Sequence, residues 1–227
     1  HFAGLDGRVI LPTAEDCALA RPNGMAWCTP IEDGPFYGGL LLDALCRRWA
    51  AQRTAAAAAD ARTIARGLVA LGRASAVDGF IARGFADDGR SHYPASSEDQ
   101  TLPWFYGLWR YSRRGLPDPA ERAELAALLE RQARGLEAHG WQIPCDPPAF
   151  GYRGNYVRPK HTDAARLLFL VRAMHELTGR ASWLERYREL ALAVPGPDGR
   201  TRRDWAAAGM DYHSPAVPDY NYHGTAS

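Results

Sequence analysis

The residues best suited to chemistry lie between positions 91 and 111, where a polar loop leads into an aromatic helical pattern. His92 and Tyr93 belong to the loop, and Asp99 lies where the helical pattern begins. Apolar side chains then recur at the spacing of one helix face: Leu102, Phe105, Tyr106 and Trp109. A carboxylate beside a histidine and aromatic rings suits a pocket for a flat, partly polar ligand such as a sugar ring. A capped core helix explains the same residues, so this stretch alone leaves both interpretations open.

Two further helical patterns also open on an aspartate. Asp33 and Asp163 occupy the same place in their segments as Asp99, and the three lie 66 and 64 residues apart along the chain. Short connections within helix pairs alternate with long connections between pairs, which predicts a repeat with every long loop on one face. We therefore expect Asp33, Asp99 and Asp163 at the same end of the helix array. Helix capping explains each aspartate taken singly.

The hydrophobic periodicity predicts six helices, which must position these residues. We expect the first helix to begin near Gly34, the second after Thr54, and the third at Gln100 or Thr101. The fourth should begin after Asp118, the fifth at Thr162 or Asp163, and the sixth near Ser182. Ser97 and Gln100 would fit a capping box, but Pro103 favours the later start of the third helix. Gly38-Gly39 is costly inside a helix and indicates close approach by a neighbouring helix or a ligand. We expect one domain over 1–227, with three helix pairs over 32–194 and loop regions over 1–31 and 195–227.

The long connection 141–160 is rich in aromatic and basic side chains. Connections of this length are usually functional or disordered. Trp104, Trp141, Tyr152 and Tyr156 could stack on sugar faces, although at least two of the four are expected in the core. Arg153, Arg158 and Lys160 could hold an acidic group on a ligand, or could belong to a basic surface loop. His92 and His161 could orient a carboxylate or bind a hydroxyl group.

Composition narrows the classes of function. The chain has 227 residues, 46% of them hydrophobic, enough to bury a core, and its net charge of +1 argues against a nucleic-acid surface. No apolar run reaches the roughly 18 residues that span a bilayer. The four cysteines show no metal-ligand spacing, and no cofactor motif is present, so we expect neither metal nor cofactor.

The sequence begins at His1 without an initiator methionine, which predicts a processed or excised segment. Compartment and oligomeric state stay open.

Two windows resemble a known superfamily. Glu32–Leu45, EDGPFYGGLLLDAL, and Glu98–Tyr111, EDQTLPWFYGLWRY, resemble helix entrances of the unsaturated glucuronyl and rhamnogalacturonyl hydrolases, six-hairpin glycosidases. The resemblance implies an all-α fold, an α/α toroid, in which Asp99 acts as general acid and base and Asp33 supports it. Gln100 departs from the pattern, since those families usually carry a paired acidic or Trp-Asp sequence here. In architecture the resemblance spans about residues 24–194.

The resemblance also implies completeness and function. Six hairpins need twelve helices, so the six predicted here would form a partial barrel, with 195–227 leading to further helices. The expected activity is glycoside hydrolysis of uronate-containing oligosaccharides, with Asp99, Asp33 and His161 catalytic. The expected substrate-binding residues are His92, Tyr93, Trp104, Trp141, Tyr152, Arg158, Lys160 and Asp163. A lyase or a sugar epimerase of the same architecture is an alternative, as is a non-catalytic helical-repeat binding module.

Overall fold

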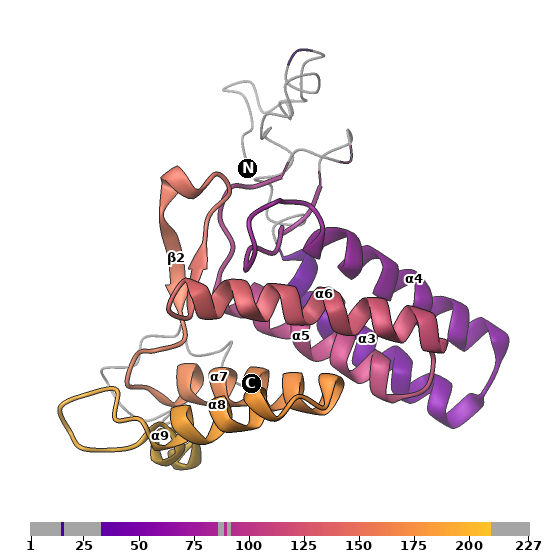
Figure 1. The fold of residues 1–227 in the computed structure, drawn as a ribbon. Helices are drawn as coiled ribbons and strands as arrows, with labels where there is room; N and C mark the ends of the chain where they lie inside the picture. Colours follow the sequence, from indigo (N-terminus) through magenta and orange to yellow (C-terminus); the bar gives the residue numbers. More distant parts are fainter. Residues whose placement is uncertain (1–14, 16–32, 86–88, 90–91, 210–227) are drawn as a thin grey trace.

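The computed structural model describes residue 15, residues 33–85, residue 89 and residues 92–209. In these ranges the fold is all-α, as expected, with seven α-helices and one short hairpin (Figure 1). The helices are α3 (Gly34–Gln52), α4 (Ala55–Gly72), α5 (Glu98–Arg113), α6 (Pro119–Ala138), α7 (His161–Thr178), α8 (Ala181–Leu192) and α9 (Arg202–Ala208). Of the loop region expected over 1–31, the structure describes residue 15 alone, so the prediction for the rest lies outside the described residues.

Local capping rules explain several helix ends. The Thr54 side chain accepts from the Ala57 N–H, and the Asp118 side chain accepts from the Glu121 N–H, so α4 and α6 begin where their caps predict. Gly179 has φ of 68°, the left-handed conformation that ends α7. Of the two starts considered for the third helix, the later one was wrong, because α5 begins at Glu98, directly after Ser97, and carries Pro103 inside it.

Two segments expected to be loops contain secondary structure. The connection 141–160 folds into an antiparallel hairpin of β1 (Gln142–Pro144) and β2 (Tyr152–Asn155), joined through the 3-10 turn η2 (Pro148–Phe150). The region after residue 195 contains α9, whose Thr201 and Asp204 form a capping box. Neither element is long enough to give a strong periodic signal in the sequence.

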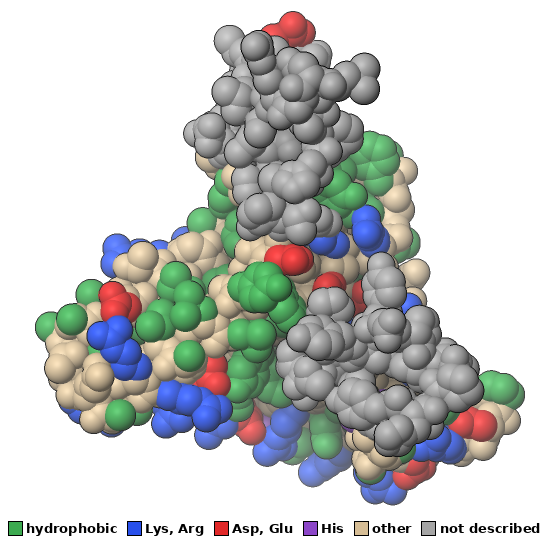
Figure 2. All heavy atoms as spheres, turned by 180° about the vertical axis from the view of Figure 1, so that it is seen from behind, with side chains coloured by type: hydrophobic (Ala, Val, Ile, Leu, Met, Phe, Trp, Pro, Cys, Tyr) green, Lys and Arg blue, Asp and Glu red, His purple; other side chains and the backbone are tan. Residues whose placement is uncertain are grey.

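The helices form two layers. Helices α3, α5 and α7 contact one another in that order, and each also contacts the helix that follows it in the chain, α4, α6 or α8. Figure 1 shows α6 crossing in front of α3 and α5, with the hairpin at the end of the array where α7 begins. Figure 2 shows the opposite side, where hydrophobic and charged side chains are interspersed. Among the described helices, none is long and apolar enough to cross a membrane.

The closest contact between helices joins α3 to α5. A Cβ added to Gly39 would lie 2.0 Å from the Pro103 carbonyl oxygen, and one added to Gly107 would lie 2.7 Å from Gly39 Cα. The sequence prediction that the glycine pair marks close approach by a neighbouring helix is therefore confirmed at Gly39. This crossing fixes the start of α3 against the start of α5.

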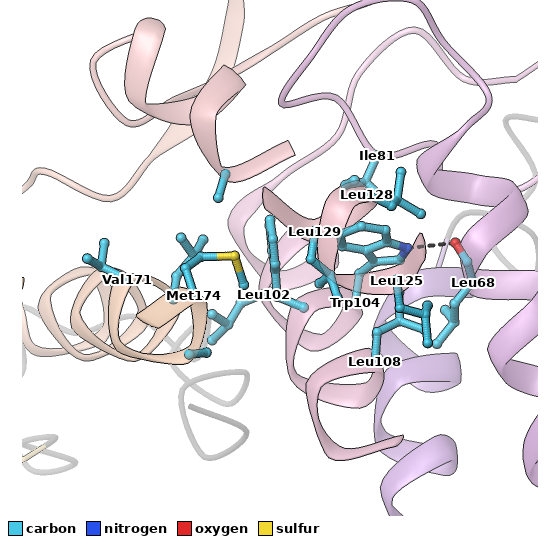
Figure 3. Packing of buried hydrophobic residues seen from close by; sticks show 14 of the residues in the cluster. Leu68, Ile81, Leu102, Trp104, Leu108, Leu125, Leu128, Leu129, Val171 and Met174 are labelled. Carbon is cyan, nitrogen blue, oxygen red and sulfur yellow. Dashed lines mark hydrogen bonds between the residues drawn. The ribbon is translucent and has the colours of Figure 1, made fainter. Parts of the chain in front are cut away.

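One hydrophobic core joins the two layers. In Figure 3 the Trp104 ring of α5 lies among Leu125, Leu128 and Leu129 of α6, and its indole N–H donates to the Leu68 carbonyl of α4 at 2.6 Å. Met174 and Val171 extend the same cluster to α7. The core thus holds the helix entrances at fixed positions relative to one another.

Candidate functional site

Helices α3, α5 and α7 begin side by side at one end of the molecule. Gln100 near the start of α5 donates from Nε2 to Asp33 Oδ1 at 2.6 Å. Arg158 joins α5 to α7, since its Nε donates to Asp163 Oδ2 at 2.5 Å and its Nη2 donates to Glu98. The expectation that Asp33, Asp99 and Asp163 share one end of the array is confirmed by these contacts. We call Asp33, Glu98, Asp99 and Asp163 the acidic rim.

Gln100 caps α3 from a different helix. Its side chain is fully buried, and its Oε1 accepts from the Phe36 N–H at 3.3 Å while its Nε2 binds Asp33. Asp33 precedes α3 but makes no side-chain cap of its own. The amide of Gln100 therefore takes over the usual role of an N-cap side chain, and the Asp33 carboxylate is free of it.

Glu98 and Asp163 are neutralised within the protein. Arg158 contacts both carboxylates, the Lys160 ammonium lies 3.4 Å from Asp163 Oδ1, and the Asn155 N–H donates to Glu98 at 3.3 Å. Burial raises the pKa of Asp163, although the Arg158 hydrogen bond and the charges of Lys160 and Arg158 offset part of the rise. These two carboxylates fasten α5, α7 and the hairpin together.

Asp33 and Asp99 have a different environment. Both are partly exposed, and within the described residues neither forms an ion pair. Asp33 accepts from the Gln100 amide, and Asp99 Oδ1 accepts from the Ser97 hydroxyl. Pro103 has no N–H to donate to the Asp99 carbonyl, so the backbone here departs from regular helical bonding. The rim thus holds two oriented carboxylates that no cation of the described residues neutralises.

Trp104 and Trp141 do not take the predicted role. Trp104 has no exposed surface, and Trp141 is 7% exposed in the same core. Stacking on a sugar requires a ring face open to solvent, so the prediction that these two indoles bind substrate was wrong. Their apolar rings contribute more by filling the space between the helix layers.

Asp163 departs from its predicted binding role, and Arg158 is its partner. Asp163 has no exposed surface, so a ligand cannot contact it, and it holds Arg158 in place instead. The Arg158 guanidinium already binds two carboxylates and the Asn155 carbonyl. It therefore has a structural role, and these contacts give no support to the prediction that it binds the carboxylate of a ligand.

His92 and His161 bind other parts of the protein. His92 Nε2 lies 3.0 Å from Asp146 Oδ2, which joins the connection before α5 to the hairpin. His161 Nδ1 lies 3.1 Å from the Ala206 carbonyl oxygen, so this ring contacts α9. Neither histidine contacts Asp33 or Asp99, and the expected catalytic role of His161 has no support from its position.

The remaining predicted binding residues lie on the hairpin side of the rim. The Tyr93 hydroxyl accepts from Arg153 Nη1 at 3.1 Å, and Tyr152 is half exposed with its hydroxyl 3.2 Å from His139 Nδ1. Lys160 is exposed beside the start of α7. Tyr93, Tyr152 and Lys160 are thus accessible to a ligand, and Arg153 is an exposed cation without an ion pair among the described residues.

Arg83 and Asp43 carry structural roles that the sequence patterns did not show. Arg83 is buried beside the rim, and its Nη2 donates to Ser97 Oγ at 2.9 Å. Asp43, on α3, accepts from Arg110 Nε at 2.5 Å and from the Tyr106 hydroxyl at 3.0 Å. The spacing of Asp43 and Arg47 on one helix face was the only sequence signal for the ion pairs around Asp43.

Within the described ranges, no group of three or more His, Cys, Asp or Glu side chains is placed to hold a metal ion. Comparison of the chain with protein-family models, with curated proteins and with solved structures finds no match.

Proposed function

We propose that the acidic rim is the active site of a carbohydrate-active enzyme, a glycoside hydrolase working by general acid/base catalysis. The observation that carries the proposal is the contrast within the rim. Arg158 and Lys160 neutralise Glu98 and Asp163, whereas Asp33 and Asp99 are held by neutral donors at adjoining helix entrances. Most glycoside hydrolases use a pair of carboxyl groups that differ in their environments.

In the proposed reaction, Asp99 gives a proton to the glycosidic oxygen while the bond from that oxygen to the anomeric carbon breaks. Water adds its oxygen to the anomeric carbon, and the proton it loses returns to the carboxylate. Asp33 supports the positive charge that develops on the sugar ring. The reaction consumes one water molecule and gives two products that each carry a new hydroxyl group, so it needs no cofactor.

The two-layer arrangement supports an α/α toroid. Helices α3, α5 and α7 would belong to its inner ring and α4, α6 and α8 to its outer ring, giving a partial barrel. A structure determined with any sequence that flanks these residues tests this. Further helix pairs that continue both rings would establish the toroid, and a different packing partner for α3 would refute it.

The proposed substrates are uronate-containing oligosaccharides. Arg153 and Lys160 supply exposed positive charge beside Tyr93, which suits the carboxylate of a uronate. Arg153→Gln should weaken binding of a glucuronate-containing disaccharide far more than binding of its neutral glucose analogue. Equal binding of both sugars by the parent protein would reject the uronate preference.

The central test is Asp99→Asn, assayed on a panel of oligosaccharides that includes an unsaturated glucuronyl disaccharide. The change removes proton transfer but keeps the shape, so turnover should fall by about 10²–10⁴. The melting temperature should change little, because asparagine keeps an acceptor oxygen for Ser97 and loses only a first-turn charge, which contributes about 0.3–1 kcal/mol. Asp118→Asn, at the start of α6, is the matched control and should retain turnover. Full turnover by Asp99→Asn would remove Asp99 from the mechanism. Absence of turnover by the parent protein on the whole panel would reject the hydrolase and leave the non-catalytic binding module.

A lyase is the second candidate. Arg153 Nη1 donates to the Tyr93 hydroxyl, and the Arg83 guanidinium lies 5.5 Å from the Tyr93 ring centroid. Two cations beside a phenol suit its use as the base that removes a proton next to a uronate. A lyase would generate an ultraviolet-absorbing double bond in its product, whereas hydrolysis of a saturated substrate generates none.

A further inference from the structure

Arg83 contacts the entrances of both α3 and α5. Only 5% of its surface is exposed, and its Nε donates to the Ala95 carbonyl at 3.0 Å. Its carbonyl oxygen accepts from the Gly34 N–H at 3.1 Å, and a Cβ added to Gly34 would lie 2.4 Å from that oxygen. The backbone of Arg83 therefore fixes the residue that follows Asp33.

The side chain of Arg83 fixes the other carboxylate through Ser97. Arg83 Nη2 donates to Ser97 Oγ at 2.9 Å, and Ser97 in turn contacts Asp99 Oδ1. A guanidinium has donors and no acceptor, so the serine oxygen must accept from it. The hydroxyl proton of Ser97 is then left for Asp99, and the direction of both hydrogen bonds is determined.

Ser97 makes these bonds instead of its usual one. It is the N-cap residue of α5, yet its side chain caps no N–H of the helix. Gln100, the other member of the expected capping box, is bound to Asp33 and Phe36. Both residues thus break a local rule in favour of contacts to the rim, and such exceptions concentrate at functional sites.

We propose that Arg83 and Ser97 are positioning residues of the proposed reaction, which hold Asp99 at a fixed place relative to Asp33. Ser97 occupies Asp99 Oδ1, so Oδ2 is the oxygen that exchanges a proton with the substrate. This inference depends on the proposed function, because it assigns the orientation of the group that the reaction uses.

We call the hydrogen bonds from Arg83 to Ser97 and from Ser97 to Asp99 the relay. Ser97→Ala tests it with the same unsaturated glucuronyl disaccharide. Losing the bond frees the Asp99 carboxylate to rotate, so kcat should fall about tenfold while KM stays unchanged. Ser97→Thr keeps the hydroxyl and should restore kcat. Arg83→Lys keeps the charge but not the fork geometry, and should also lower kcat.

Ser96→Ala is the matched control. Ser96 is fully buried, and its Oγ lies 3.4 Å from Thr101 Oγ1, outside the relay. It should lose comparable stability and keep its kcat. A kcat for Ser97→Ala equal to that of the parent or of Ser96→Ala would overturn the relay, and so would failure of Ser97→Thr to restore turnover.

The two proposals fail separately. If Asp99→Asn is inactive while Ser97→Ala retains full kcat, the positioning role is wrong and the proposed function stands. If Asp99→Asn retains full turnover, Asp99 is not the catalytic acid and the positioning inference is overturned. If the parent protein turns over none of the oligosaccharides, the proposed function itself is wrong.

Discussion

Arg158 holds together the two carboxylates that α5 and α7 bring to the acidic rim. Asp163 has no exposed surface, whereas the Arg158 side chain is 43% exposed and reaches it from the solvent side. A buried carboxylate is costly without a cation, because its hydration is lost. At this scale the partner of each acidic group decides whether it is structural or available for chemistry.

Arg158→Gln should therefore lower the free energy of unfolding by about 1–3 kcal/mol. A fully buried pair would cost more, but solvent around the guanidinium and the remaining Lys160 contact reduce the loss. Chemical denaturation measures the change, with Arg153→Gln as the control. Arg153 forms no ion pair among the described residues, so its replacement should change stability by less than about 0.5 kcal/mol. Equal effects of the two variants would contradict the structural role of Arg158.

Two buried carboxylates should make stability depend on pH in opposite directions. Burial raises the pKa of Asp163, so the folded chain holds this proton more tightly than the unfolded chain. Its effect is a loss of stability as pH rises from about 4 through the raised pKa. Burial also acts to raise the pKa of Asp43, but bonds from Arg110 and Tyr106 and the Arg110 charge outweigh it, and the net pKa is lowered.

The contribution of the Asp43 carboxylate to stability is therefore present above about pH 4 and is lost as pH falls through its lowered pKa. Denaturation curves over a series of pH values separate the two groups. Asp163→Asn should remove a decline on the neutral side, and Asp43→Asn should flatten the decline on the acid side. A steeper acid decline in Asp43→Asn would show that the assigned sign is wrong.

At the scale of elements, the crossing of α3 and α5 sets the geometry of the rim. Gly39 and Gly107 let the two backbones approach to contact distance, and this brings Gln100 within reach of Asp33. Larger side chains would hold the helices farther apart. The glycines therefore affect the site through helix separation, although neither contacts an acidic residue.

Gly39→Ala should cost about 1–3 kcal/mol or more of stability, since the new methyl group meets the Pro103 carbonyl and no flexible side chain can yield. Gly67→Ala is the matched control. Nothing lies within 4 Å of a Cβ at position 67, so there the change should stabilise α4 by about 0.5–1 kcal/mol. Thermal unfolding of both variants measures this. Stabilisation by both would disprove the close crossing.

For the whole molecule, a single core links the two layers and should unfold as one unit. Leu129 is fully buried beside Trp104, and the same cluster continues to Met174 of α7. Leu129→Ala should therefore lower the free energy of unfolding by about 2–5 kcal/mol. Unfolding curves followed by fluorescence and by circular dichroism should coincide in a single transition. Leu192→Ala, at a side chain 61% exposed, should change stability by less than about 0.5 kcal/mol. Separate transitions for the two probes would indicate independent layers.

The sequence by itself determined the helices and the side of the array on which the acidic residues lie. Hydrophobic period, caps such as Thr54 and Asp118, and the stop at Gly179 depend on residues within about four positions of one another. Alternating connection lengths then placed Asp33, Asp99 and Asp163 at one end, because short connections reverse the chain direction. These features follow from local interactions, which the order of residues contains directly.

Only the tertiary structure decided which side chains are partners. Ser97 and Gln100 suit a capping box in sequence, yet Arg83 binds one and Asp33 binds the other, and Asp33 and Gln100 lie 67 residues apart. Trp104 likewise fits either a binding surface or a core, and the position of α6 decides for the core. The physical reason is that a hydrogen bond or a buried face depends on the direction and distance of groups from other elements, and only the packed helices fix those.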